Sequence, residues 1–154
     1  MLRVIKDNAN TLTVTLTEKS TVSNPIYLFK FTNQTSNVAY WFISSDTSQF
    51  KQRYNKFLLT EKNNANTLNG EITLGLEGRY DYEIYQTNLA NTSGLSSASD
   101  AIENIVKTVE VGIVDVVFDV KEYAKYEVQY DTNIVYQPDP LNNNFTYILP
   151  FILT

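Results

Sequence analysis

The sequence predicts an all-β fold: a β-sandwich, immunoglobulin-like or jelly-roll-like, with an extended C-terminal arm. The first observation is that apolar and polar residues alternate in several short segments, as they do in half-buried strands. The second is that turn-forming residues separate these segments at intervals of about ten residues, which is typical of sandwiches and barrels. The third is that 43% of the 154 residues are hydrophobic, which is enough for one substantial core.

The first three predicted strands lie in the N-terminal third. Thr11 to Thr17 alternates apolar residues with threonines, so one of its faces is expected to be buried. Two aromatic-rich segments follow, Ile26 to Asn33 and Val38 to Ser44, and a short polar turn between them predicts a hairpin. The second segment carries Trp41 and is apolar on both faces. This pattern predicts a central strand that is covered on both sides.

The middle of the chain predicts a further strand and a second hairpin. Lys56 to Glu61 is the strand candidate. Glu71 to Glu77 and Arg79 to Gln86 both alternate cleanly, and Gly78 between them is a turn residue. We therefore expect these two segments to pair directly.

The body is predicted to end with a short helix and a last strand. The helix is expected near Asp100 to Val106, because Asp100 and an acidic residue three positions later have the spacing of a capping box. Lys107 to Val117 is the last strand, and Gly112 inside it indicates a bulge or a close approach of another chain segment. Residues 1–117 are thus assigned to the sandwich body.

Residues 118–154 are assigned to a β-rich arm that is poor in glycine and rich in aromatic residues. Its alternating pattern predicts strands with one face to bury. A short domain has little spare core, so we expect the arm to contact a neighbouring copy or another protein. The competing interpretation is that the arm adds strands to its own domain. The predicted interface residues are Tyr126, Val128, Tyr130, Ile134, Tyr136, Phe145, Tyr147, Leu149, Phe151 and Leu153.

Composition excludes several classes of function. The chain has no Cys and no His, which removes disulfides, thiolate nucleophiles, imidazole bases and zinc sites built on these residues. A net charge of -5 argues against nucleic acid as a partner. The N-terminus does not have the pattern of a signal peptide, and no apolar run is long enough for a membrane helix. We expect no cofactor, no membrane partner and synthesis in a reducing cytoplasm.

The best candidates for chemistry are carboxylates. Asp81 and Glu83 are two residues apart in a predicted strand, so they lie on one face about 7 Å apart, within the range that glycosidases use. They alternate with core-facing residues, however, which places them on the solvent face. Asp131 and Asp139 lack the spacing of a calcium loop and are explained by turn chemistry. The sequence therefore predicts neither an enzyme nor a metal site.

Three segments carry a resemblance to a known family. They are LTEK…NPIYLFKFTN near the start, RYNKF…TE, and the strand that contains Gly78, Tyr80, Tyr82, Ile84 and Tyr85. In these segments the chain resembles small β-rich virion structural proteins of tailed phages of Bacteroidota, including crAss-like phages. The resemblance covers about Leu12 to Val116 and implies a capsid-associated or auxiliary structural role. The arm from Phe118 departs from the family pattern.

The functional hypothesis is a non-enzymatic virion structural protein. The resemblance implies a head auxiliary or decoration protein that binds other virion proteins, the major capsid protein first among them, in the virion and in the host cytoplasm during assembly. Homo-oligomeric or lattice contacts through the apolar arm are expected. The alternative is a carbohydrate-binding or host-attachment module of a phage fibre or tail, with Trp41 and the tyrosines as stacking surfaces. That alternative predicts aromatic residues on exposed loops.

Overall fold

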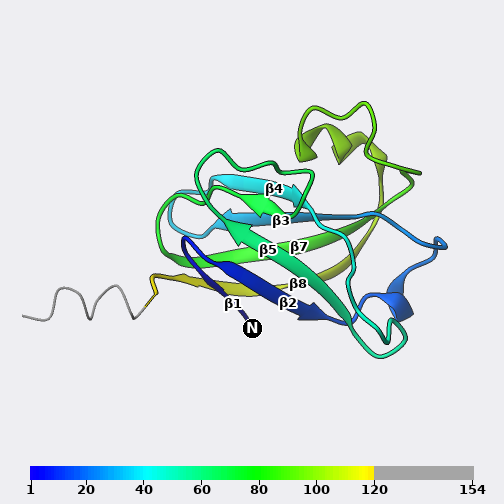
Figure 1. Ribbon diagram of the computed structural model, residues 1–154, viewed down its shortest axis with the longest axis horizontal. Helices are drawn as coiled ribbons and strands as arrows, with labels where there is room; N and C mark the ends of the chain where they lie inside the picture. Colours follow the sequence, from blue (N-terminus) through cyan, green and yellow to red (C-terminus); the bar gives the residue numbers. More distant parts are fainter. Residues whose placement is uncertain (120–154) are drawn as a thin grey trace, which may run out of the picture. The chain divides into compact units, whose positions relative to one another are not determined.

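The computed structural model describes residues 1–119 and confirms an all-β, sandwich-like fold. Two sheets face each other, as Figure 1 shows: a five-stranded sheet in the order β1-β8-β7-β3-β4 and a three-stranded sheet in the order β2-β5-β6. The strands are β1 (Leu2–Ile5), β2 (Ala9–Val14), β3 (Tyr27–Asn33), β4 (Ala39–Ile43), β5 (Asn55–Glu61), β6 (Glu71–Ile72), β7 (Gly78–Thr87) and β8 (Ile105–Val117).

The larger sheet joins strands from both ends of the described chain. Within the larger sheet, β8, β7, β3 and β4 are antiparallel neighbours, and this succession matches the G-F-C-C′ succession of variable-type immunoglobulin domains. β1 adds to β8 in parallel. In the smaller sheet β2 pairs with β5 in antiparallel fashion, and the two-residue β6 adds to β5 in parallel.

The core between the sheets is aromatic. Phe29 stacks on Phe42 with ring centroids 4.7 Å apart, and it meets Phe57 of the opposite sheet edge-on at 4.9 Å. All three side chains are fully buried, as is Tyr80 on β7. These residues occupy alternate positions of their strands, as the period of two requires. The predicted alternation of buried residues in this part of the chain is confirmed.

The β3–β4 hairpin is confirmed, with Phe29 opposite Phe42, but the prediction that β4 is a central strand is wrong. β4 is the edge of its sheet. Its outer backbone groups are partly covered by a loop: the Ile43 N–H donates to Thr67 at 2.7 Å, and the Ile43 carbonyl accepts from Gly70 at 2.7 Å. The strand is apolar on both faces because the core covers one face and a second apolar cluster covers part of the other.

The predicted second hairpin is also wrong. Only Glu71–Ile72 is a strand, and it belongs to the smaller sheet, whereas β7 begins at Gly78 in the larger one. The intervening segment crosses between the sheets. Leu74 is buried as predicted, but its N–H donates at 3.0 Å to the carboxylate of the buried Glu61 instead of to a partner strand. Leu76 is 69% exposed.

Two other element boundaries differ from the prediction. β2 ends at Val14 because the following N–H groups of Leu16 and Thr17 donate to the Asn55 side chain, at 2.8 and 3.2 Å, and a short 3-10 helix, η1 (Thr17–Lys19), begins there. The predicted short helix exists as the 3-10 helix η2 (Ala98–Asn104).

The predicted role of Asp100 in capping η2 changes. Asp100 lies in the first turn of η2 and accepts the N–H groups of Ser96 and Ser97, both at 2.9 Å, so Ser97 stands at the cap. The carboxylate therefore satisfies donors that precede the helix. Asp100 thus takes the second position of the capping box, whereas the sequence predicted it at the first.

Gly112 on β8 marks a close approach and not a bulge. The irregularities in the β7–β8 ladder lie between Ile84 and Tyr85 and between Gln86 and Thr87. Gly112 stands opposite Tyr82, and a Cβ at Gly112 would lie 2.6 Å from the Tyr82 ring. The Tyr82 ring therefore occupies the space that a side chain at position 112 would need.

Candidate functional site

The predicted interface residues of the arm, Tyr126 to Leu153, lie outside the described residues, and their role stays a prediction. The structure does show where the described part of the chain ends. At the end of β8 the Lys6 N–H donates to the Val117 carbonyl at 2.8 Å, and the Lys6 ammonium lies 5.6 Å from the centre of the Phe118 ring. Asn8 contacts the Asp119 carboxylate at 3.5 Å. The described part of the chain therefore ends beside the turn between β1 and β2.

The candidate carboxylate pair lies on the outer face of the larger sheet, and each member has a partner there. Glu83 accepts a 2.6 Å hydrogen bond from the Lys30 ammonium, and Asp81 accepts one of 2.7 Å from the Gln34 side chain. The Lys30 hydrogen bond is the main cause that holds the pKa of Glu83 below its ordinary value. A carboxyl group of that kind is ionised at neutral pH and is a poor proton donor.

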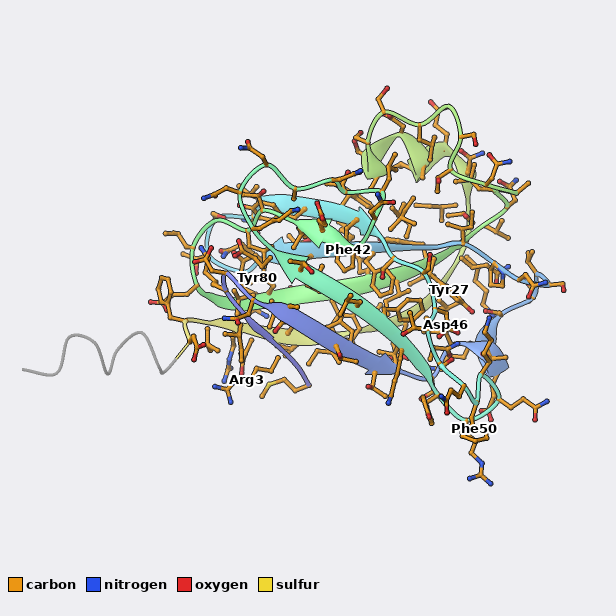
Figure 2. All side chains as sticks on the ribbon, viewed as in Figure 1. Arg3, Tyr27, Phe42, Asp46, Phe50 and Tyr80 are labelled. Carbon is orange, nitrogen blue, oxygen red and sulfur yellow. The ribbon has the colours of Figure 1, made fainter. Side chains whose placement is uncertain are left out.

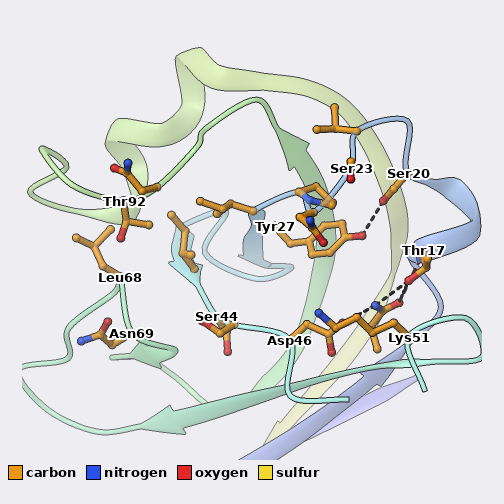
Figure 3. Close-up of a pocket in the computed structure, with 18 residues that line it drawn as sticks. Thr17, Ser20, Ser23, Tyr27, Ser44, Asp46, Lys51, Leu68, Asn69 and Thr92 are labelled. Atoms are coloured by element: carbon orange, nitrogen blue, oxygen red, sulfur yellow. Dashed lines mark hydrogen bonds between the residues drawn. The ribbon is translucent and has the colours of Figure 1, made fainter. Parts of the chain in front are cut away.

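Among the described residues, a polar pocket of about 680 Å³ lies at the end of the sandwich opposite the C-terminal end of β8. It lies between the β2–β3 connection, the β4–β5 loop, the β5–β6 connection and the β7–β8 connection (Figure 3). Hydroxyl, amide and charged groups line its wall, among them Ser20, Ser44, Asp46, Lys51 and Asn69.

Asp46 is a fixed anionic group in this wall. Its carboxylate accepts the N–H groups of Ser48 at 2.9 Å and Lys56 at 3.1 Å, and the Asn55 side-chain amide at 2.8 Å. Burial raises the pKa of Asp46, but these hydrogen bonds to the charged form outweigh burial and lower the pKa overall. Asn55 in turn accepts the Leu16 N–H. Asp46 and Asn55 therefore tie the β4–β5 loop to the end of β2.

Tyr27 supplies a hydroxyl at the floor of the pocket. Its ring is buried, and its hydroxyl lies 2.6 Å from the Ser20 hydroxyl. Burial is the main cause that raises the pKa of Tyr27, so the phenol stays protonated at neutral pH. Nearby, the buried Gln86 side chain accepts the Thr21 N–H at 2.8 Å. The pocket thus combines neutral donors and acceptors with the Asp46 carboxylate and the Lys51 ammonium.

An exposed aromatic and cationic loop adjoins the pocket. We call residues 47–54 the Phe50 loop. Phe50 is 60% exposed at its tip (Figure 2) and meets Tyr54 edge-on at 6.5 Å. Lys51 lines the pocket, and Arg53 follows two residues later in a chain of net charge -5. Sequence reasoning missed this feature because a single Phe in a polar, irregular segment has no periodicity.

Two other properties hold for the described part of the chain. Residues 1–119 contain no group of three or more acidic, His or Cys side chains that is placed to hold a metal ion. No helix in the same part is both long enough and apolar enough to span a membrane. Asp131 and Asp139, the weak candidates for calcium, lie outside the described residues.

Comparison of the chain with protein-family models, with curated proteins and with solved structures gives no match.

Proposed function

We propose that the chain is a non-enzymatic structural protein of a phage virion, a head auxiliary or decoration protein that binds capsid neighbours through its C-terminal arm. One structural observation supports this most. The apolar core between the sheets is built by residues from Val4 to Val116, and β8, the last described strand, ends at Val117. The apolar residues of the arm therefore follow a sandwich whose core is already filled. The segments that resemble phage virion proteins supply the rest of the argument.

The energetic basis is repetition. Each large apolar side chain that the arm buries contributes about 1.5–3 kcal/mol. A symmetric lattice repeats the contact in every copy, so individually weak contacts hold the assembly firmly. The major capsid protein and neighbouring copies of this chain are the proposed partners. In this proposal the arm binds the neighbouring proteins and thereby holds the sandwich body on the particle.

Removal of the end of the arm tests this function. A chain that lacks Phe145–Thr154 is expected to be lost from purified particles of the virus that encodes it, while the melting temperature of the isolated protein changes little. Occupancy in an electron cryo-microscopy map and a thermal melt give the two measurements. Val38→Ser is the matched control, because Val38 is a 47% exposed apolar residue on the sandwich body. Equal losses of stability and incorporation would contradict the proposal.

The loop end of the sandwich favours a second candidate, a carbohydrate-binding or host-attachment module. Phe50 is an exposed aromatic ring on a loop beside a polar pocket, as this function requires. Binding to a glycan array, abolished by Phe50→Ala and kept by Val38→Ala, would establish this function. An array without signal for the full chain would remove it.

A further inference from the structure

The edges of the two sheets differ in how they are protected. An edge strand exposes unpaired backbone N–H and C=O groups, and proteins protect such edges with short strands, charges, or coverage by loops. β6 has only two residues. On β4, a loop bonds the outward backbone groups of Ile43. On β1, the Asn10 side chain bonds the N–H and carbonyl of Ile5 at 2.7 and 3.0 Å, and Arg3 places a charge on the same short strand.

Among the described edge strands, β2 leaves the longest row of outward backbone groups without a partner, longer than the one that remains on β4. The Glu61 N–H donates to the Asn8 carbonyl at 3.0 Å, so Asn8 and Glu61 face each other in the β2–β5 ladder. Because hydrogen-bonded pairs alternate along an antiparallel ladder, every second residue from Asn8 to Val14 directs its backbone N–H and C=O groups to β5. The backbone groups of Ala9, Thr11 and Thr13 point to the free side. No partner within residues 1–119 bonds those groups.

The open edge of β2 has the properties of a template for another strand. From Ala9 to Val14 it has six residues, with no charge and no proline. Its inward side chains, Leu12 and Val14, are buried in the core, whereas Thr11 and Thr13 are exposed. A strand that adds to this edge must therefore present apolar residues inward and polar residues outward. The added strand would give the smaller sheet a fourth member opposite β1.

The arm contains a segment with that alternation. Tyr126, Val128 and Tyr130 share one face, and Lys125, Glu127 and Gln129 share the other. From Val120 to Tyr130 the sequence has no Gly, Pro, Asn, Asp or Ser, the residues that make tight turns. β8 runs toward the sandwich end at which β2 begins, so a segment that lies on its own β2 must first reverse direction. The lack of these residues argues against a reversal within this segment and for an acceptor strand on a neighbouring molecule.

We propose that Lys125–Tyr130 of one copy adds as a fourth strand to the free edge of β2 in a second copy of this chain. This proposal rests on the proposed function, since it names the surface on which the arm docks. It predicts that the amides of Thr11 and Thr13 become hydrogen-bonded only when two copies associate.

Amide hydrogen exchange of the full chain, measured by NMR over a range of protein concentrations, tests the proposal. Protection of the Thr11 and Thr13 amides is expected to rise as the concentration rises and to be lost on dilution. The amides of Ala39 and Trp41, on the free edge of β4, are the internal control and should not change. Protection of Thr11 and Thr13 that is independent of concentration would show docking of the chain's own arm and overturn the proposal, and so would no protection.

A pair of variants provides a second measurement. Thr13→Pro removes an N–H that points to the free edge and leaves the β2–β5 hydrogen bonds in place. It is expected to weaken self-association, measured by analytical ultracentrifugation, at least tenfold. Thr13→Val keeps the N–H and should associate like the unmodified chain. Equal association of the two variants would overturn the proposal.

The outcomes separate this proposal from the proposed function. If removal of Phe145–Thr154 abolishes incorporation into particles but Thr11 and Thr13 stay unprotected, the arm acts elsewhere and the β2 proposal fails alone. If incorporation survives the removal, the proposed function fails. Concentration-dependent protection would then still support strand addition between copies.

Discussion

The two faces of the five-stranded sheet use the same strands in different ways. On the inner face, Phe29 and Tyr80 are fully buried against the opposite sheet. On the outer face, residues 1–119 cover one end alone. There Leu28 and Ile43 pack with Ala98 and Ala101 of η2, whereas the rest carries ion pairs and exposed apolar residues of β8 such as Val111, 64% exposed.

The comparison teaches that adjacent residues of one strand depend on different parts of the chain. Phe29 packs on residues of the other sheet, so its burial requires the whole sandwich. Leu28, one position earlier, packs under a short helix that lies far along the chain. At the open part of the outer face, Lys30 pairs with Glu83 and lies 5.5 Å from the centre of the Trp41 ring. Packing therefore dominates the inner face, and polar pairs dominate the open part of the outer face.

Phe29→Ala should cause the largest loss of stability. The ring makes a stacked and an edge-on contact with two other buried rings, and its removal leaves a cavity between the sheets. We expect the free energy of unfolding to fall by about 3–5 kcal/mol, measured by urea denaturation. A loss smaller than that of Leu28→Ala would reverse the order proposed for the two faces.

Leu28→Ala should have a smaller effect, about 2–3 kcal/mol, at the low end for buried leucine truncations. Leu28 is fully buried, but its neighbours under η2 include partly exposed side chains such as Leu95, which can move into the space. The same denaturation experiment measures it. Amide exchange should show that η2 loosens while the β3–β7 ladder stays protected, and equal loosening of both would contradict independent clusters.

Gly112→Ala should cost about 1–3 kcal/mol, because the added methyl group overlaps the Tyr82 ring on the inner face. In a Tyr82→Ala background the same substitution should cost much less. The two single variants and the double variant form a cycle that isolates the clash. Additive losses in this cycle would show that the ring is not the obstacle.

Glu83→Gln should have the smallest effect, about 0–1 kcal/mol, because the Lys30–Glu83 pair is partly exposed and screened by solvent. The pKa of Glu83 is lower in the folded chain than in the unfolded one. Its contribution is therefore complete above the unfolded pKa and is lost as the pH falls through the folded pKa. Urea denaturation in acid and at neutral pH should show a smaller difference for the variant, and an unchanged difference would exclude this contribution.

Strand faces are the part of this protein that its sequence determines. The alternation of Tyr80, Tyr82 and Ile84 predicts their burial, and the polar turn before β4 predicts the β3–β4 hairpin, because both depend on residues close together in the chain. The resemblance, the arm and its partners remain predictions. The placement of Asp81 and Glu83 on an outer face was predictable for the same local reason.

Strand partners and the loop-end site were decided by the tertiary structure alone. A period of two says which side of a strand is apolar but not which strand lies beside it, so Glu71–Ile72 joins β5 where a hairpin with β7 was expected. Gly70 has a φ of +70°, and a Cβ there would lie 2.5 Å from the Leu58 carbonyl oxygen. The need for glycine at this position therefore becomes visible only in the folded chain. Likewise Tyr27, Asp46 and Asn69 share a pocket because four connections distant in sequence meet at one end of the sandwich. Contacts between distant segments carry no periodic signal, and for that reason only the fold shows them.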